Sequence, residues 1–206
     1  MKLFKQFLLL SLSMIMLSSC AKIFYSPDAK QLAAKQKIIA IVPPKVSIPA
    51  NKKVEAEALK EQQRTESLNF QNEMYSWMLR RKMQGKFSQE IQEIETTNAK
   101  LKKAGYPETP LTNAEICGVL GVDGIMTSNY SLSKPMSDGA AVAVGLLVGV
   151  WGATNQVNVS VSITDCNKQK LIWNYDHTFS GSVGSTSARL VDGLMRRASK
   201  KIPYKN

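Results

Sequence analysis

The sequence predicts a domain of the α/β (α+β) class, in which helices cover a mixed β-sheet of about five strands. Three observations lead to this prediction. Residues 37–42 form a continuous, largely β-branched run that two prolines stop, residues 53–83 contain neither Pro nor Gly, and residues 157–164 and 171–179 alternate apolar with polar side chains. These patterns indicate a buried strand, a long first helix and a C-terminal β-hairpin, which a terminal helix follows.

Length and composition place the chain among folded globular proteins. It has 206 residues, of which 44% are hydrophobic and 21% are charged. Such a chain holds one domain or at most two small ones, and its composition excludes both a disordered chain and a multi-pass membrane protein.

The first twenty residues resemble a bacterial lipoprotein signal peptide. Lys2 and Lys5 precede an apolar run from Phe7 to Leu17, which is shorter than the roughly 20 residues of a spanning helix and ends in small residues. Leu17-Ser18-Ser19-Cys20 matches the lipobox. The resemblance implies that residues 1–19 are removed and that Cys20 carries the acyl chains, including palmitate, that hold the protein at a membrane.

The mature chain is basic, but export makes nucleic acid an unlikely partner. Without residues 1–19 it has 25 basic and 16 acidic side chains, a formal charge of +9. In the cell envelope the available polyanions are lipid headgroups, lipopolysaccharide and cell-wall carboxylates. We therefore expect no nucleic-acid partner, and a solvated basic surface without a specific partner is the simplest interpretation.

The first half of the mature chain predicts a tether, a strand and a long helix. Residues 20–36 are polar without a firm period and suit a tether, so the single folded domain is expected over 37–204. The run at 37–42 is typical of a central strand buried on both faces. In the helix over 53–83, Phe70, Met74, Trp77 and Met78 share one stripe, whereas residues 53–67 predict a projecting, largely solvated half.

Shorter elements are expected between residues 85 and 132. Gly85 ends the long helix, and residues 87–95 alternate weakly, which indicates an edge strand. Thr96 or Thr97 then begins a short helix that Gly105 stops, and Thr112 or Asn113 begins another that reaches Leu120. A strand follows within residues 121–132.

The C-terminal third predicts two paired strands and an amphipathic helix. Residues 157–164 and 171–179 each place an apolar side chain at every second position, with a turn near Asn167. Residues 185–201 follow a helical period. Their inward side chains are expected to be Val191, Leu194, Met195, Ala198 and Ile202, and their outward ones Arg196, Arg197, Lys200 and Lys201.

An uncharged segment, residues 139–152, precedes the hairpin. As a helix it is too short to span a bilayer, and Ala141, Gly145 and Gly149 share one face that allows close packing. As an extended segment it has the length of a membrane strand but lacks clean alternation. A buried small-residue helix or loop, a membrane contact and a homo-oligomer contact are the three alternatives.

Cys117 and Cys166 have two open interpretations. Export permits a disulfide, which forms only if the fold brings the two Cα atoms within about 7 Å. Two buried thiols are the other interpretation. Neither cysteine has a Cys or His neighbour at metal-binding spacing.

The residues offer little catalytic chemistry. His177 is the only histidine, which removes most Ser-His, Cys-His and two-histidine zinc sites, and its place in the alternating segment indicates a packed side chain. No phosphate-binding loop, dinucleotide fingerprint or Gly-x-Ser-x-Gly occurs. Asp123 and Asp165 are expected to hold turns. We therefore expect no enzyme, no metal and no cofactor.

Five segments resemble envelope lipoproteins related to the curli-secretion lipoprotein CsgG, whose fold is similar to that of the TolB amino-terminal domain and the lipoprotein activators of penicillin-binding proteins. These segments are 37–44, 116–125, 161–166, 171–175 and 201–204. The resemblance implies a lipid-anchored assembly, secretion or cell-wall accessory factor that binds an envelope protein, peptidoglycan or its own copies. Because Ala21 and not Asp follows Cys20, the family rule indicates the outer membrane, on its periplasmic side.

Two alternatives stand beside this function. The curli channel family inserts two strands per subunit, whereas this chain offers one uncharged segment without alternation, so a ring- or pore-forming secretion subunit is the second interpretation. An enzyme with a site assembled from unlinked residues is the third. Fold similarity alone chooses none of them.

Overall fold

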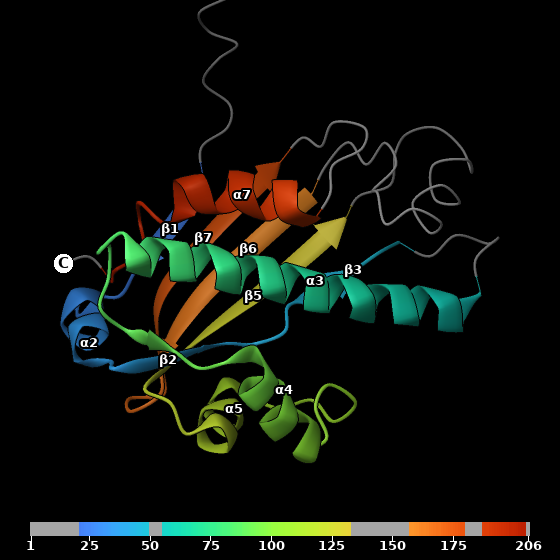
Figure 1. Ribbon diagram of the computed structural model, residues 1–206, viewed down its shortest axis with the longest axis horizontal. Coiled ribbons are helices and arrows are strands. Elements are labelled where there is room, and N and C mark those ends of the chain that lie inside the picture. Colours follow the sequence, from blue (N-terminus) through green and yellow to red (C-terminus); the bar gives the residue numbers. More distant parts are fainter. Residues whose placement is uncertain (1–20, 50–54, 133–156, 180–186, 205–206) are drawn as a thin grey trace, which may run out of the picture.

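The computed structural model describes residues 21–49, 55–132, 157–179 and 187–204. It has the predicted fold class, with a mixed sheet and helices on both of its faces (Figure 1). The described part of the sheet has seven strands in place of the predicted five. Their bounds are β1 (Lys22–Tyr25), β2 (Ile38–Ile41), β3 (Lys45–Ser47), β4 (Glu90–Ile91), β5 (Gly124–Leu132), β6 (Val157–Asp165) and β7 (Lys170–Phe179).

Antiparallel pairing dominates one half of the sheet and parallel pairing the other. The strand order is β1-β7-β6-β5-β2-β4, with β3 also paired to β5. Among β1, β7, β6 and β5 each strand is antiparallel to its neighbour. β2 and β3 each pair with β5 in parallel. Residues 43 and 44 are both proline, which lacks the N–H that a sheet ladder needs, so β2 ends and β3 begins on either side of them.

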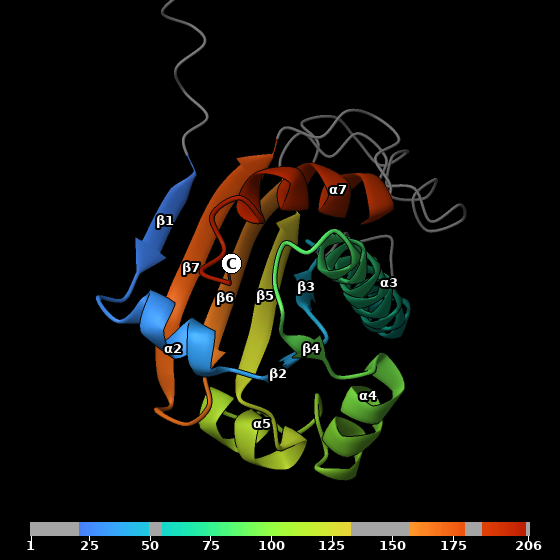
Figure 2. The ribbon, with the colours of Figure 1, turned by 60° about the vertical axis from the view of Figure 1, so that its left-hand side comes forward.

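The helices divide between the two faces of the sheet. Figure 2 shows α3 (Ala56–Met83) and α7 (Ser187–Ala198) lying across one face. α2 (Ala29–Lys35) packs near β7, whereas α4 (Ile94–Lys103) and α5 (Asn113–Leu120) lie at one end of the opposite face. Of the two predicted start residues, Thr112 is the N-cap of α5, through a capping box with Glu115, and Gly121 ends the helix in the left-handed conformation at φ 65°.

Two apolar clusters follow from this arrangement. The larger one joins α3 and α7 to the sheet and contains the predicted stripe of Phe70, Met74, Trp77 and Met78. Phe70 stacks on Tyr130 of β5 with ring centroids 4.0 Å apart. The smaller cluster packs α4 and α5 on Ala40, Val42 and Ile125. β2 therefore buries both of its faces, as its continuous apolar run predicts.

The N-terminal segment differs from the prediction. The sequence indicates a tether up to residue 36, whereas residues 22–25 pair with β7 and residues 29–35 form α2. Ala29, Leu32 and Ala33 of α2 are buried. One strand of four residues and one helix of seven are too short to show a clear period, so their packing on the sheet decides their structure. The folded domain thus begins near Lys22.

Two strand predictions also need correction. β2 lies next to the edge of the sheet, since only the two-residue β4 pairs outside it, and so it is not central. β3 is absent from the prediction because its three residues follow two prolines. The terminal helix and the hairpin occur where they are predicted, with α7 over Ser187–Ala198.

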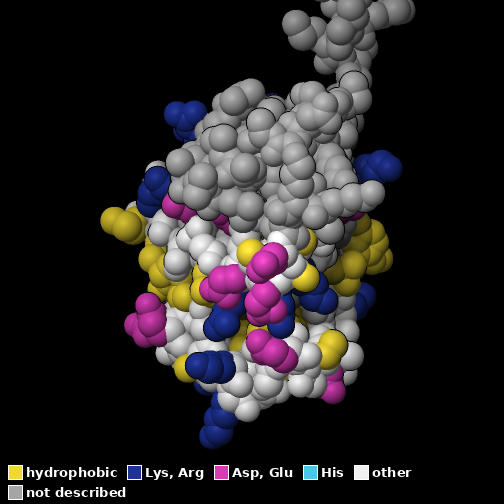
Figure 3. Space-filling model, turned by 90° about the vertical axis from the view of Figure 1, so that its right-hand side faces the viewer, with side chains coloured by type: hydrophobic (Ala, Val, Ile, Leu, Met, Phe, Trp, Pro, Cys, Tyr) yellow, Lys and Arg dark blue, Asp and Glu magenta, His cyan; other side chains and the backbone are white. Residues whose placement is uncertain are grey.

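The first ten residues of α3 project from the domain, as the sequence predicts. None of residues 56–65 is buried, and burial begins at Glu66. Exposed Glu55, Glu57 and Glu61 lie at this end of the helix. Figure 3 shows acidic side chains gathered on this side of the molecule.

Candidate functional site: a polar face of the sheet

The face of β5, β6 and β7 that points away from α3 and α7 is lined with polar side chains, all of them uncharged except Asp176. Because successive side chains of a strand point to opposite faces, the residues between the buried apolar ones share this side. We call these nine residues the polar face: Thr127, Asn129, Ser131, Asn158, Ser160, Ser162, Asn174, Asp176 and Thr178. All are exposed or half-buried.

The register of the strands arranges the polar face in three rows. Side chains directly opposite one another on antiparallel strands lie about 4.5 to 5.5 Å apart. The rows are Thr127-Ser162-Asn174, Asn129-Ser160-Asp176 and Ser131-Asn158-Thr178. β1 extends the first two rows with Phe24 and Lys22, which pair with Asn174 and Asp176. Phe24 is 48% exposed and adds an aromatic ring at the edge of the face.

Asn174 organises the centre of this surface. Its Oδ1 accepts hydrogen bonds from Ser162 Oγ at 2.7 Å and Ser160 Oγ at 3.1 Å, and its Nδ2 donates to Asp176 Oδ2 at 2.7 Å. In the third row, Thr178 Oγ1 donates to Asn158 Oδ1 at 2.7 Å. These bonds orient the hydroxyl and amide groups before any ligand arrives, which lowers the entropy cost of binding.

Helices α4 and α5 border the polar face at one end, and a disulfide fixes α5 there. Cys117 of α5 is bonded to Cys166, which directly follows β6, with a Cα–Cα distance of 5.4 Å. The backbone N–H of Cys166 donates to Asp123 O at 2.9 Å. Of the two interpretations of these cysteines, the structure contains the disulfide.

Among its nine residues the polar face has one carboxylate, that of Asp176, which accepts a hydrogen bond from Asn174, and it has no imidazole. His177 lies on the opposite face of β7, is 6% exposed, and has its Nε2 3.2 Å from Nη1 of Arg197. Burial, helped by the positive charge of Arg197, lowers the pKa of His177 below its ordinary value. The single histidine of the chain is therefore a packed residue, as predicted, and cannot activate Ser160 or Ser162.

Asp123 connects two strands. Its carboxylate accepts hydrogen bonds from the backbone N–H groups of Lys37 and Ile38. The bond from Ile38 is the main reason that the pKa of Asp123 lies below its ordinary range, and the bond from Lys37 acts in the same direction. The prediction of a turn role is therefore wrong in detail, because Asp123 holds the start of β2 and not its own turn.

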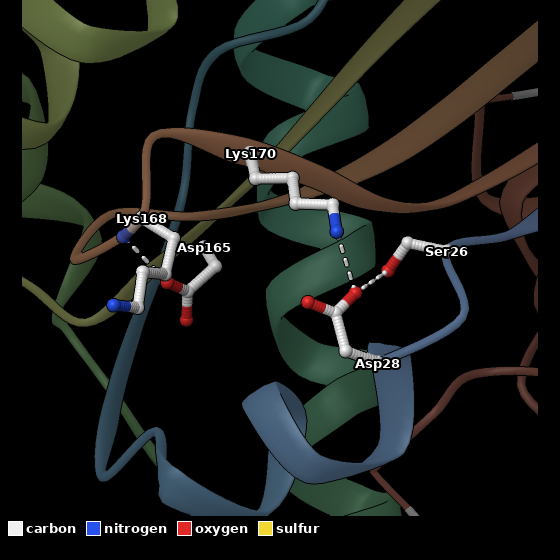
Figure 4. A network of polar contacts seen from close by, with 5 residues as sticks. All are labelled: Ser26, Asp28, Asp165, Lys168 and Lys170. Carbon is white, nitrogen blue, oxygen red and sulfur yellow. Dashed lines mark hydrogen bonds and ion pairs between the residues drawn. The ribbon is translucent and has the colours of Figure 1, made fainter.

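A buried polar cluster lies at the hairpin end of the sheet. Asp165 accepts from Gln36 Nε2 and from the backbone N–H of Lys168, both at 2.8 Å, and Gln36 Oε1 accepts from Tyr204 Oη at 2.6 Å. Figure 4 shows Asp165 beside Lys168, and the neighbouring bonds of Asp28 with Ser26 and Lys170. Asp165 holds its turn as predicted. Gly124 lies against this cluster, and a Cβ at this position would require the Gln36 side-chain amide to shift.

The other predicted site residues lie outside the described residues. They are Cys20 and the three small residues of the uncharged segment, Ala141, Gly145 and Gly149. In the part of the chain that is described, no group of His, Cys, Asp and Glu side chains could hold a metal ion. No helix within the same residues has both the length and the apolar character needed to cross a membrane.

The polar face itself is absent from the sequence-based prediction, although its pattern is visible. The residues of β6 on the polar face are Asn158, Ser160 and Ser162, a set without Lys or Glu. Exposed strand faces commonly carry charges for solubility. A strand whose exposed side chains are all small and polar is the sequence feature that could have indicated a binding surface.

Comparison with known proteins finds similar structures and no similar sequence. No protein-family model matches this chain, and no curated protein matches it. A PelC dodecamer from Paraburkholderia phytofirmans is similar at a TM-score of 0.42 and 10% identity, over 91% of this chain and 97% of that one. Lipoprotein GNA1162 from Neisseria meningitidis has a TM-score of 0.40 and 10% identity, over 80% and 95%.

The C-terminal domain of LpoB from Salmonella enterica is a third similar structure. Its TM-score is 0.34 and its identity 11%, over 74% of this chain and 96% of that one. At these TM-scores and identities, the three likenesses carry no argument about what this chain does.

Proposed function

We propose that this protein is a lipid-anchored, non-enzymatic envelope lipoprotein that acts as an assembly, secretion or cell-wall accessory factor. In this proposal the acyl chains on Cys20 attach it to the outer membrane on the periplasmic side, and the polar face binds an envelope partner. The single observation that carries the proposal is the position of Lys22. It begins β1 only two residues after Cys20, and it pairs with Asp176 of the polar face.

The short connection determines where the polar face would lie. Two residues of fully extended chain span about 7 Å at most. An acyl anchor on Cys20 would therefore keep the first strand of the domain within about 7 Å of the lipid surface. The polar face would then meet its partner close to the membrane, where tethering raises the effective concentration of both.

The chemistry of the polar face favours a partner rich in hydroxyl and amide groups. Serine, threonine and asparagine form directional hydrogen bonds without net charge, and the exposed ring of Phe24 can stack on an apolar face of a ligand. Peptidoglycan strands carry such groups, and so do polar protein surfaces. Peptidoglycan is thus the first partner to test, and an envelope protein is the second.

The test compares one substitution on two surfaces of the full-length lipoprotein. Asn129→Lys with Asn158→Lys places two long cations on the polar face, whereas Asn69→Lys with Asn72→Lys makes the same change at two exposed positions of α3. We expect the polar-face variant to lose both co-sedimentation with isolated peptidoglycan and in-cell cross-links to envelope proteins, and the α3 variant to keep them. If both variants keep all contacts, the polar face is not the binding surface.

The anchor is tested separately. We expect wild-type protein to incorporate labelled palmitate and to fractionate with outer membranes, and Cys20→Ala to lose the label and leave the membrane fraction. Labelled palmitate that persists in Cys20→Ala would contradict lipidation at this residue. A Cys20→Ala variant that still binds peptidoglycan through the polar face would separate attachment from recognition.

A ring- or pore-forming subunit is the second candidate function, and one observation favours it. Leu132, the last residue of β5, pairs with Val157, the first residue of β6. The two described residues that flank the uncharged segment in sequence therefore lie together, at the end of the sheet toward which Lys22 also lies. Native mass measurement of membrane-extracted protein distinguishes the two functions. A ring that Val144→Glu disrupts would support this candidate, and a monomer insensitive to Val144→Glu would reject it.

A further inference from the structure

A pocket of about 530 Å³ lies where the last turns of α3 and α7 meet the C-terminal tail. Figure 2 shows this tail, marked C, beside the ends of both helices. The volume falls within the roughly 300 to 1,000 Å³ of small-molecule sites. No residue of the polar face lines it, so this is a separate site.

The floor of the pocket is apolar and mostly aromatic. Trp77 and Met78 of α3, together with Phe87 and Tyr204, line it, and all four are buried. The rings of Phe87 and Tyr204 have centroids 6.4 Å apart and are tilted by 41°. The small part of these side chains that the pocket leaves open can contact an aromatic or aliphatic group of a ligand.

The rim of the pocket is cationic. The Arg81 guanidinium lies 5.3 Å from the centroid of the Trp77 ring, and Lys86 and Lys200 are exposed at the edge. None of the residues lining the pocket is acidic. Within the described residues, neither Lys86 nor Lys200 has an ion-pair partner. Among the described residues that line the pocket, three positive charges thus lie around the apolar floor and no side chain is acidic.

The ends of the two helices do not need these cations for hydrogen bonding. Backbone N–H groups of Gln84, Gly85 and Lys86 donate to carbonyls in the last turn of α3. Residues 199, 201 and 202 donate in the same way to carbonyls at the end of α7. Basic side chains at a helix end often serve as substitutes for such donors. Here the backbone already supplies them, which leaves the lysines available to a ligand.

We propose that this pocket binds a small amphiphilic anion. Its apolar or aromatic group would pack on Trp77, Phe87 and Tyr204, and its carboxylate or phosphate would contact Arg81, Lys86 and Lys200. Arg81 stacked on an indole can bind an anionic oxygen with its outward N–H groups. The site lies beyond the proposed function, because it depends neither on acylation of Cys20 nor on the polar face.

The test uses three ligands with one body and different head groups. 4-Phenylbutyrate, 4-phenylbutanol and 4-phenylbutylammonium are titrated calorimetrically into the full-length lipoprotein in lipid nanodiscs, with empty nanodiscs as the reference. We expect one equivalent of phenylbutyrate to bind at least tenfold more tightly than the alcohol, and no saturable binding of the ammonium. Acetate and inorganic phosphate, which lack the apolar body, are expected to bind at least tenfold more weakly than phenylbutyrate.

Two variants locate the binding. Lys86→Glu with Lys200→Glu reverses two rim charges and is expected to weaken phenylbutyrate binding by tenfold or more. Ser199→Trp places a large ring on the lining and is expected to abolish binding. The matched control is Lys102→Glu with Lys103→Glu, which changes the same charge at exposed positions of α4 outside the pocket. Circular dichroism checks that every variant is folded.

Three results would overturn the proposal. They are no phenylbutyrate binding in wild-type protein, equal binding of the ammonium and the carboxylate, and equal weakening by the rim and control variants. In each case the pocket is not a site for amphiphilic anions. Since none of these results depends on peptidoglycan binding or compares Cys20 variants, failure of this proposal and failure of the proposed function are distinguishable.

Discussion

The two faces of the central hairpin differ in what their side chains do. On one face of β6, Val157, Val159, Val161 and Ile163 are buried beneath helices. On the other face, Asn158 is exposed, and Ser160 and Ser162 are half-buried and bonded to Asn174. Alternate residues of one strand thus belong to a packed core and to a polar surface.

This difference separates the residues that stabilise the fold from those available for recognition. Burial of apolar side chains supplies most of the stabilising free energy of a domain, whereas exposed hydrogen bonds exchange with water and contribute little. The polar face can therefore change its chemistry without loss of the fold. The covered face cannot.

The strongest test of this comparison uses two adjacent residues of β5. Tyr130 is 1% exposed, stacks on Phe70, and donates a hydrogen bond to Met74 Sδ, whereas Asn129 is exposed on the polar face. We expect Tyr130→Ala to lower the free energy of unfolding by about 3 to 5 kcal/mol, because it leaves a large cavity. Asn129→Ala is expected to change it by about 0.5 kcal/mol or less. Urea denaturation of both variants measures the difference, and similar losses would contradict the division between the faces.

The disulfide that holds α5 beside the polar face has the next largest effect. It joins residues 49 positions apart, and closing a loop of this length restricts the unfolded chain. We expect Cys117→Ser with Cys166→Ser to lower the free energy of unfolding by about 2 to 4 kcal/mol. Denaturation of wild-type protein with and without reductant is the control. A variant as stable as the oxidised wild type would show that the bridge contributes nothing.

The sequence predicts the covered face well because apolar periods are local patterns. Phe70, Met74, Trp77 and Met78 repeat at helical spacing and are all buried, and the alternation of β6 matches its burial. Thr112 and Glu115 have the spacing of a capping box, and the structure contains one. In each case neighbouring residues carry the information.

Features that depend on distant residues could not be predicted in this way. β1 forms because residues 22–25 find the edge of β7, about 150 positions later in the chain. Gln36, Asp165 and Tyr204 come from three separate segments and meet only in the folded protein. The polar face combines three strands, so its rows follow from register. The pairing of Cys117 with Cys166 likewise depends on the fold.

The buried Tyr204 makes a smaller, pH-dependent contribution to the free energy of unfolding. Burial, together with the nearby Asp165 carboxylate, raises the pKa of the Tyr204 hydroxyl above its ordinary value near 10. The unfolded tyrosine therefore loses its proton at lower pH than the folded one. Its contribution to stability is full below about pH 10 and falls above it, by up to about 1.4 kcal/mol per pH unit.

Tyr204→Phe separates this contribution from the rest. At neutral pH we expect a loss of about 1 to 3 kcal/mol, since Gln36 Oε1 loses its buried donor. Between pH 9.5 and 11 we expect the stability of the variant to fall less steeply than that of wild type. Parallel denaturation series over this pH range measure both effects. Equal slopes would indicate that Tyr204 titrates normally in the folded protein.

The smallest expected effect concerns the serines of the polar face. Thr has a higher strand propensity than Ser, so a sheet selected for stability alone would favour Thr at positions 160 and 162. We expect Ser160→Thr with Ser162→Thr to keep both hydroxyl groups and to raise the free energy of unfolding by up to about 1 kcal/mol. The added methyl groups also crowd Asn174, which accepts from both serines.

The same variant tests recognition. If the polar face binds a partner closely, the variant should be at least as stable as wild type and yet sediment less with peptidoglycan, because residues at natural binding surfaces are often less stabilising than the alternatives. Greater stability with unchanged binding would instead show that partner binding does not require Ser at positions 160 and 162. It would count against the polar face as the binding surface.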